Sequence, residues 1–138
     1  MDNVGIIAGG GKLPLLVGNI LINKNYRVTF FVIKEFYNKK KYKKYKTELI
    51  ELTSLKNIIS VLKKNKIDSV IFLGKVNRPS IKEIKFDIET IRFIKYYFLQ
   101  NKGDNKLLIS IQNYFLKKGF SIFNWIHVCK ELFANKIY

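Results

Sequence analysis

The chain has 138 residues, of which 48% are hydrophobic and 14% aromatic, so it is long enough for one domain and apolar enough to bury a core. This composition excludes intrinsic disorder, no apolar run approaches the length of a membrane-spanning helix, and the first residues do not form a signal peptide. A single cysteine, Cys129, excludes an internal disulfide and favours the reducing cytoplasm.

The net charge is +16, from 26 basic and 10 acidic residues, and it favours an anionic partner. Lysine supplies 23 of the cations and arginine only three. A nucleic-acid-binding protein is expected to use more arginine, because its planar fork matches phosphate and guanine. We therefore expect most of the surplus charge to lie on solvated faces, and nucleic acid is a disfavoured partner.

The first third of the chain predicts a βαβ unit. Val4–Ala8 is a short apolar run typical of a buried strand, and a glycine turn follows it. Apolar residues at helical spacing run from residue 13 to residue 21 and predict a helix that ends near residues 23–25, with Pro14 in the first turn. Val28–Ile33 is β-branched and aromatic and predicts a second strand. A right-handed crossover between these strands makes them parallel.

The rest of the chain continues this alternation, without a linker or an internal repeat. Further strands are expected at Leu49–Leu52, Ser69–Leu73 and Phe120–Phe123, and further helices after Ser54, around Ile88–Phe98, from Asp104 to Gly119 and at Trp125–Phe133. The pattern predicts a single α/β domain over residues 1–138: a Rossmann-like, three-layer fold with a mainly parallel sheet.

The glycine turn at Gly9, Gly10 and Gly11 is the first candidate binding site. Glycines between a strand and a helix allow backbone amides to approach an anion, and the helix dipole favours negative charge there. A dinucleotide fingerprint would need glycine in place of Pro14, and a P-loop would need Ser or Thr in place of Leu13. The turn is therefore either a phosphate cradle of another type or a tight turn without a ligand.

A second candidate follows the strand at Ser69–Leu73, where Gly74 and Lys75 precede Arg78 and Pro79. Ligands of open α/β sheets lie beyond the carboxyl ends of the strands, and this loop and the glycine turn both leave from such ends. The two cations are suited to a phosphate-bearing ligand. The alternative is an ordinary basic loop.

A third candidate is Gly103-Asp104, at the start of a predicted helix. A carboxylate there can hold a metal or a sugar hydroxyl, but aspartate is also a common helix cap, and this second role is favoured. The ten acidic residues are scattered, and no two of them share a predicted site. The sequence therefore predicts no metal-binding cluster.

Residues 34–46 hold seven lysines and one glutamate, interleaved with Tyr37, Tyr42 and Tyr45. Such a run is usually a solvated loop, although it is also suited to an anionic membrane or to stacking on bases. It supports an alternative function as a basic nucleic-acid-binding module without catalysis. A plain nucleotide-binding subunit is a third hypothesis, disfavoured by the absent fingerprints.

Four stretches together resemble one family. They are GIIAGGGKLP at residues 5–14, GKVNRP at 74–79, KGDNKLL at 102–108 and LKKGF at 116–120. In order and spacing they are similar to the N-terminal half of the LpxI-type UDP-2,3-diacylglucosamine pyrophosphatases, over about residues 4–133. The GIIAGGGKLP stretch is the most specific of the four.

The resemblance implies hydrolysis of UDP-2,3-diacylglucosamine to UMP and lipid X in lipid A biosynthesis of a Gram-negative bacterium. It implies a Mg²⁺-dependent enzyme on the cytoplasmic side, with peripheral contact with the inner membrane. A second domain or chain would supply the catalytic acids and the metal site, so this chain alone is expected to be inactive. The residues expected to hold the UDP-linked acylated sugar are Gly9, Gly10, Gly11, Gly74, Lys75, Arg78, Gly103 and Asp104. Asn105 stands where the family is expected to have a second aspartate.

Overall fold

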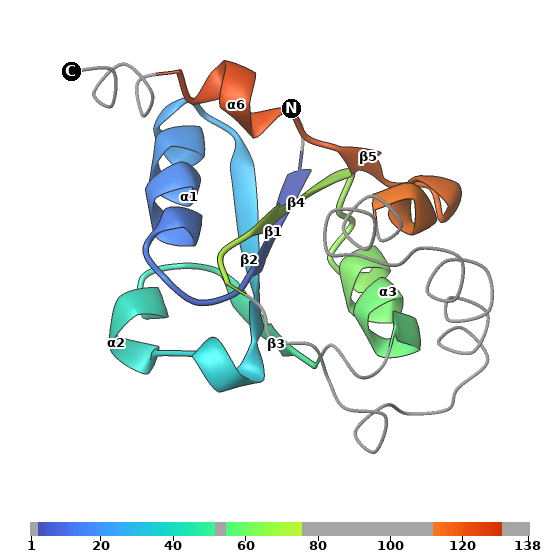
Figure 1. Ribbon diagram of the computed structural model, residues 1–138, viewed down its shortest axis with the longest axis horizontal. Coiled ribbons are helices and arrows are strands. Elements are labelled where there is room, and N and C mark those ends of the chain that lie inside the picture. Colours follow the sequence, from blue (N-terminus) through green and yellow to red (C-terminus); the bar gives the residue numbers. More distant parts are fainter. Residues whose placement is uncertain (1–2, 52–54, 76–111, 131–138) are drawn as a thin grey trace.

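Five parallel strands form the centre of the computed structural model, which describes residues 3–51, 55–75 and 112–130. The strands are β1 (Asn3–Ala8), β2 (Arg27–Ile33), β3 (Thr47–Ile50), β4 (Ser69–Leu73) and β5 (Ser121–Ile122). Their order in the sheet is β3-β2-β1-β4-β5, and each neighbouring pair is parallel (Figure 1). The predicted Rossmann-like α/β fold with a parallel sheet is confirmed.

Helices cover both faces of this sheet (Figure 1). They are α1 (Leu13–Asn23), the 3-10 helix η1 (Lys34–Phe36), α2 (Lys39–Tyr42), α3 (Leu55–Lys64), residues 112–117 and α6 (Trp125–Val128). α1 lies on one face, and α3 lies on the other beside residues 112–117. No helix in the described ranges is long and apolar enough to cross a membrane.

Most predicted elements are confirmed, but the helix expected at Trp125–Phe133 ends at Val128, and one strand has shifted bounds. The strand expected at Leu49–Leu52 lies at Thr47–Ile50 instead, because it pairs with β2 from Phe30 to Ile33 and β2 ends there. Gly119 ends the helix before β5 with a φ of +99°, as expected of a glycine cap. The predicted helix at Ile88–Phe98 and the cap at Ser54 lie outside the described residues.

Strand residues alternate between two hydrophobic cores, one on each face of the sheet. In β2, Phe30 and Val32 face the core under α1, whereas Phe31 and Ile33 face the core under α3. α1 sits close to β2, so close that a Cβ at Gly18 would overlap the Phe30 ring. The apolar runs of the sequence are therefore strands buried on both faces.

Candidate functional site

The candidate site lies where β1 and β4 end, at the carboxyl edge of the sheet. β1 is the strand at which the order of the sheet reverses: β2 and β3 follow it on one side, and β4 and β5 on the other. In open α/β sheets such a switch point is where ligands bind. The glycine turn leaves β1 here, and Gly74 and Lys75 leave β4 beside it.

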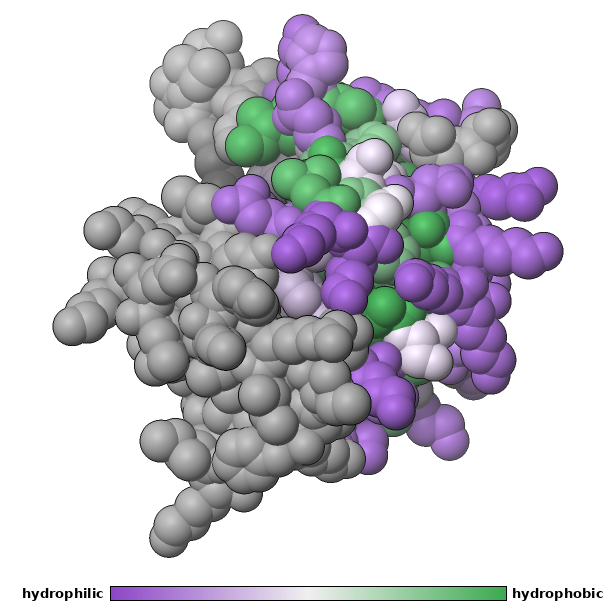
Figure 2. All heavy atoms as spheres, turned by 90° about the vertical axis from the view of Figure 1, so that its right-hand side faces the viewer, coloured by the Kyte–Doolittle hydropathy of each residue, from purple (hydrophilic) through white to green (hydrophobic). Residues whose placement is uncertain are grey.

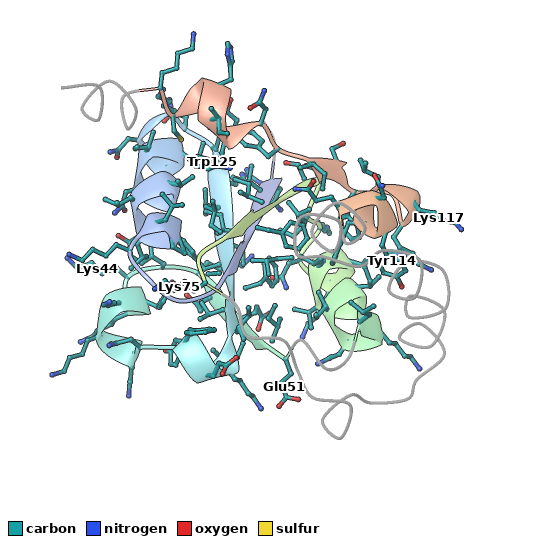
Figure 3. The ribbon with its side chains drawn as sticks, in the orientation of Figure 1. Lys44, Glu51, Lys75, Tyr114, Lys117 and Trp125 are labelled. Carbon is teal, nitrogen blue, oxygen red and sulfur yellow. The ribbon has the colours of Figure 1, made fainter. Side chains whose placement is uncertain are left out.

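Backbone hydrogen bonds join these two loops. Gly10 and Lys75 exchange a pair of them: the Gly10 amide donates to the Lys75 carbonyl at 2.9 Å, and the Lys75 amide donates to the Gly10 carbonyl at 3.0 Å. The Gly9 amide donates to the Leu73 carbonyl at 2.8 Å. We call Gly9, Gly10, Gly74 and Lys75 the glycine junction. Figure 3 shows Lys75 beside the loop that connects β1 to α1.

The glycines of the junction are required by this close approach. A Cβ at Gly9 would overlap the Lys75 carbonyl oxygen, and a Cβ at Gly10 would lie 2.8 Å from the Phe36 ring. Gly74 has a φ of +93°, and a Cβ there would lie 2.7 Å from the Gly10 carbonyl oxygen. Sequence reasoning missed Phe36, because no local pattern links it to a glycine so far away in the chain.

Gly9 and Gly10 therefore shape the loop without presenting free amides. The expectation that all three glycines offer N–H groups to a ligand is wrong for these two, because their amides already donate to backbone carbonyls. Gly11 differs: it has a φ of +96°, it is exposed, and a Cβ added there would meet no atom within 4 Å. Its amide donates to no acceptor among the described residues.

Open amides continue into the first turn of α1. Lys12 is the N-cap residue, no side chain caps the helix, and the Leu16 amide makes a bond of 3.2 Å to the Lys12 carbonyl. Pro14 has no amide hydrogen. Within the described ranges, the amides of Gly11, Lys12 and Leu13 have no acceptor. Amides at the start of an 11-residue helix, together with its dipole, favour an anion.

The charges around these amides are suited to an anionic ligand. The side chains of Lys12 and Lys75 are exposed. Glu51, past the end of β3, makes an ion pair of 2.9 Å with Lys34, so its charge is offset. Figure 3 shows Glu51 well separated from Lys75. The edge at β1 and β4 therefore combines open amides with lysines.

Part of the predicted site is not described by the structure. Arg78, Gly103 and Asp104 lie outside the described residues. In the part that is described, no group of three His, Cys, Asp or Glu side chains could hold a metal ion. Cys129 is fully buried in the core under α1, so it packs there.

The lysine–tyrosine segment, residues 34–46, is more ordered than a solvated loop. Tyr42 is buried, and both Tyr42 and Tyr45 contact the Phe30 ring edge-on at 5.4 and 5.2 Å between ring centres. Burial raises the pKa of the Tyr42 phenol. Tyr37 stacks on Tyr42 at 6.0 Å. The expectation of a simple solvated loop is therefore wrong for Tyr42 and Tyr45, which anchor the segment to the core.

Comparison with known proteins identifies the family of this domain. The family model described as the LpxI N-terminal domain matches residues 3–132. The match covers nearly the whole chain, and the chain belongs to this family. LpxI is a UDP-diacylglucosamine pyrophosphatase of the lipid A pathway, so the chain corresponds to one part of such an enzyme. No match was found among curated proteins.

Proposed function

We propose that this member of the LpxI N-terminal domain family holds the diphosphate-bearing part of UDP-2,3-diacylglucosamine at the carboxyl edge of its sheet. The observation that carries the proposal is the row of open amides at Gly11, Lys12 and Leu13, next to the glycine junction. A diphosphate oxygen can accept from such amides, while the Lys12 and Lys75 side chains offset its charge.

The glycine junction gives this site its rigidity. The two hydrogen bonds between Gly10 and Lys75 fix the loop after β4 to the loop after β1. The amides of the first turn of α1 are then held in place before a ligand arrives, which lowers the ordering cost of binding. Gly9, Gly10 and Gly74 contribute to binding by shaping the loop, and Gly11 contributes its amide.

The remaining predicted residues complete the proposal. Arg78 follows the junction by three residues and precedes Pro79, which favours extended backbone and a defined direction for the arginine. It is proposed to bind the diphosphate with Lys75. Gly103 and Asp104 are proposed to contact the sugar part of the substrate. These three residues lie outside the described ranges, so this assignment rests on the sequence resemblance.

Hydrolysis to UMP and lipid X is proposed to need a second domain or chain. The described acidic residues, Glu35, Glu48, Glu51 and Asp68, do not fit a Mg²⁺ site, because no three potential ligands in the described ranges come together. Metal-assisted attack on a diphosphate requires clustered carboxylates. On the family resemblance, the residues that hold Mg²⁺ and activate water are proposed to belong to that second part, and residues 1–138 to form one substrate-holding domain.

The same proposal includes a location. An enzyme of lipid A synthesis that uses UDP-2,3-diacylglucosamine would act in the cytoplasm, in peripheral contact with the inner membrane that holds its acylated substrate. Nucleic acid is not proposed as a partner. The tyrosines that a base-stacking surface would need are packed on Phe30 or on one another.

The proposal can be tested by calorimetric titration of the chain with soluble UDP-glucosamine. Lys75→Gln is expected to weaken binding about tenfold, since it removes a charge-assisted contact while leaving the backbone bridge intact. Lys56→Gln on α3, which removes the same charge from an exposed position elsewhere, is the matched control and is expected to bind normally. Equal affinities for both variants would contradict the assignment of Lys75.

A separate experiment tests whether hydrolysis needs the second domain or chain. The purified chain, incubated with UDP-2,3-diacylglucosamine and Mg²⁺, is expected to release no UMP above the uncatalysed rate. Addition of the acid-bearing second part of an LpxI enzyme is expected to restore release. Robust UMP release by the chain alone would contradict the proposal that the chemistry lies elsewhere.

A further inference from the structure

Helix α1 has an apolar face that the described part of the protein leaves uncovered. Its eleven residues, LPLLVGNILIN, include no charged side chain. Leu16 is 47% exposed and Ile22 is 39% exposed, although both are large aliphatic residues. Asn19, also exposed, lies between them, and the spacing of three residues places all three on one side of the helix. A surface helix normally presents charged residues on this side.

The lysine–tyrosine segment lies directly beside this face. The Tyr45 hydroxyl donates to the Asn19 side-chain oxygen at 2.6 Å, which joins the segment to the exposed side of α1. Lys43 and Lys44 immediately precede Tyr45. Figure 3 shows Lys44 projecting away from the ribbon on the side where α1 lies. The exposed side of α1 and the lysines next to Tyr45 therefore lie on the same side of the molecule.

The lysines of this surface are available to a partner. Lys40, Lys43 and Lys44 are exposed, and no carboxylate in the described ranges forms an ion pair with them. Tyr42, which lies between them in the chain, is buried. The aromatic anchors thus fix the backbone while the lysines remain in contact with solvent.

We propose that the α1 face and the adjacent lysines form a docking surface for an anionic phospholipid bilayer. Exposed aliphatic side chains next to lysines are the combination that binds the interface of such a membrane: the aliphatic groups enter the headgroup boundary and the lysines attract anionic headgroups. A nucleic acid fits this surface less well, for two reasons. The lysines of the surface lack the planar fork of arginine, and Tyr42 and Tyr45 are already packed on Phe30 and cannot stack on bases. The inference assigns residues to the membrane contact of the proposed function, and it does not depend on diphosphate binding at the sheet edge.

Sedimentation with vesicles of phosphatidylglycerol and phosphatidylcholine tests the contribution of the lysines to membrane binding. The full chain is expected to bind the mixed vesicles at low salt and to bind pure phosphatidylcholine much more weakly. Replacing Lys40, Lys43 and Lys44 together by Gln is expected to weaken binding about a hundredfold, at about fivefold per lysine. Far-ultraviolet circular dichroism and the melting temperature check that this variant is folded.

A matched control removes the same charge from the other face of the sheet. α3 carries three exposed lysines, Lys56, Lys63 and Lys64. Figure 2 views the molecule from the side on which α3 lies in Figure 1 and shows hydrophilic side chains beside the grey region. Replacing these three by Gln is expected to reduce vesicle binding less than fivefold. An equal loss in both triple variants would overturn the proposal, since binding would then follow net charge alone.

A second variant tests the exposed aliphatic side chains of α1. Leu16→Gln with Ile22→Gln is expected to weaken vesicle binding at least tenfold without unfolding the chain, because both side chains are exposed. Three outcomes would overturn the proposal. They are unchanged binding in this variant, no binding of the parent chain to anionic vesicles at low salt, and tighter binding of a short oligonucleotide than of the vesicles. If this double variant lost self-association and kept vesicle binding, the exposed face of α1 would be assigned to a second copy of the chain. That result would also overturn the membrane proposal.

Discussion

The glycine junction and the lysine–tyrosine segment both leave the carboxyl edge of the sheet, yet they are held in opposite ways. The junction is held by main-chain hydrogen bonds between Gly10 and Lys75, and its three glycines have no side chains to pack. The segment is held by side chains, the Tyr42 and Tyr45 rings on Phe30. A region held by main-chain contacts is destabilised when a substitution adds atoms. A region held by side-chain packing is destabilised when a substitution removes them.

This difference also separates what each region can bind. At the junction, the absence of side chains leaves the Gly11 amide and the first turn of α1 open to a small anion. In the segment, the tyrosines occupy the inside and the lysines the outside, which is suited to a broad anionic surface. The two regions therefore have different proposed ligands, a diphosphate and a bilayer, and variants should separate them.

The largest expected effect is the loss of the aromatic anchor. Tyr42→Ala removes a buried ring, so the free energy of unfolding should fall by about 3 kcal/mol. The more exposed Tyr37 is the matched control, and Tyr37→Ala should cost less than about 1 kcal/mol. Urea denaturation measures both. Equal losses would mean that Tyr42 does not anchor the segment.

Adding one carbon to the junction should cost somewhat less. Gly9→Ala places a Cβ against the Lys75 carbonyl oxygen and should destabilise the fold by about 2–3 kcal/mol. Gly11→Ala meets no atom and incurs only the strain of positive φ, about 1 kcal/mol. The two alanine variants can be compared by thermal and urea unfolding. A larger loss for Gly11→Ala would show that the two loops are not in close contact.

A smaller effect concerns alkaline pH. The pKa of Tyr42 is raised above its ordinary value of 10.0 by burial. Above about pH 10 the unfolded chain therefore binds fewer protons than the folded one, so this residue's contribution to stability is present below that pH and is lost as pH rises. Unfolding at several pH values should show a shallower alkaline fall for Tyr42→Phe than for the parent. Parallel curves would contradict a buried Tyr42 phenol.

Much of the fold could be predicted from local sequence. The runs at Val4–Ala8, Val28–Ile33 and Ser69–Leu73 are predominantly apolar, and each lies in a strand with both faces buried. Parallel pairing follows from the βαβ pattern. The bounds of β3 could not be predicted in the same way, because its register depends on where β2 ends, which no residue within β3 specifies.

The candidate site was predictable only in outline. Both loops could be assigned to the carboxyl edge, because parallel strands end on the same side of a sheet. The use of the Gly9 and Gly10 amides by backbone carbonyls was not predictable, since their acceptors lie more than sixty residues later in the chain. The packing of Tyr42 and Tyr45 on Phe30 was missed for the same reason: it is a tertiary contact that overrides a strongly polar local composition.

The central claim is that the open amides beside the glycine junction bind the diphosphate of the substrate. Amide chemical shifts of the ¹⁵N-labelled chain, followed while UDP-glucosamine is added, test it most directly. The account predicts saturable shifts centred on Gly11, Lys12, Leu13 and Lys75, with little change at residues 39–44. Saturable shifts confined to residues 39–44, or none at any of these positions at millimolar ligand, would contradict it.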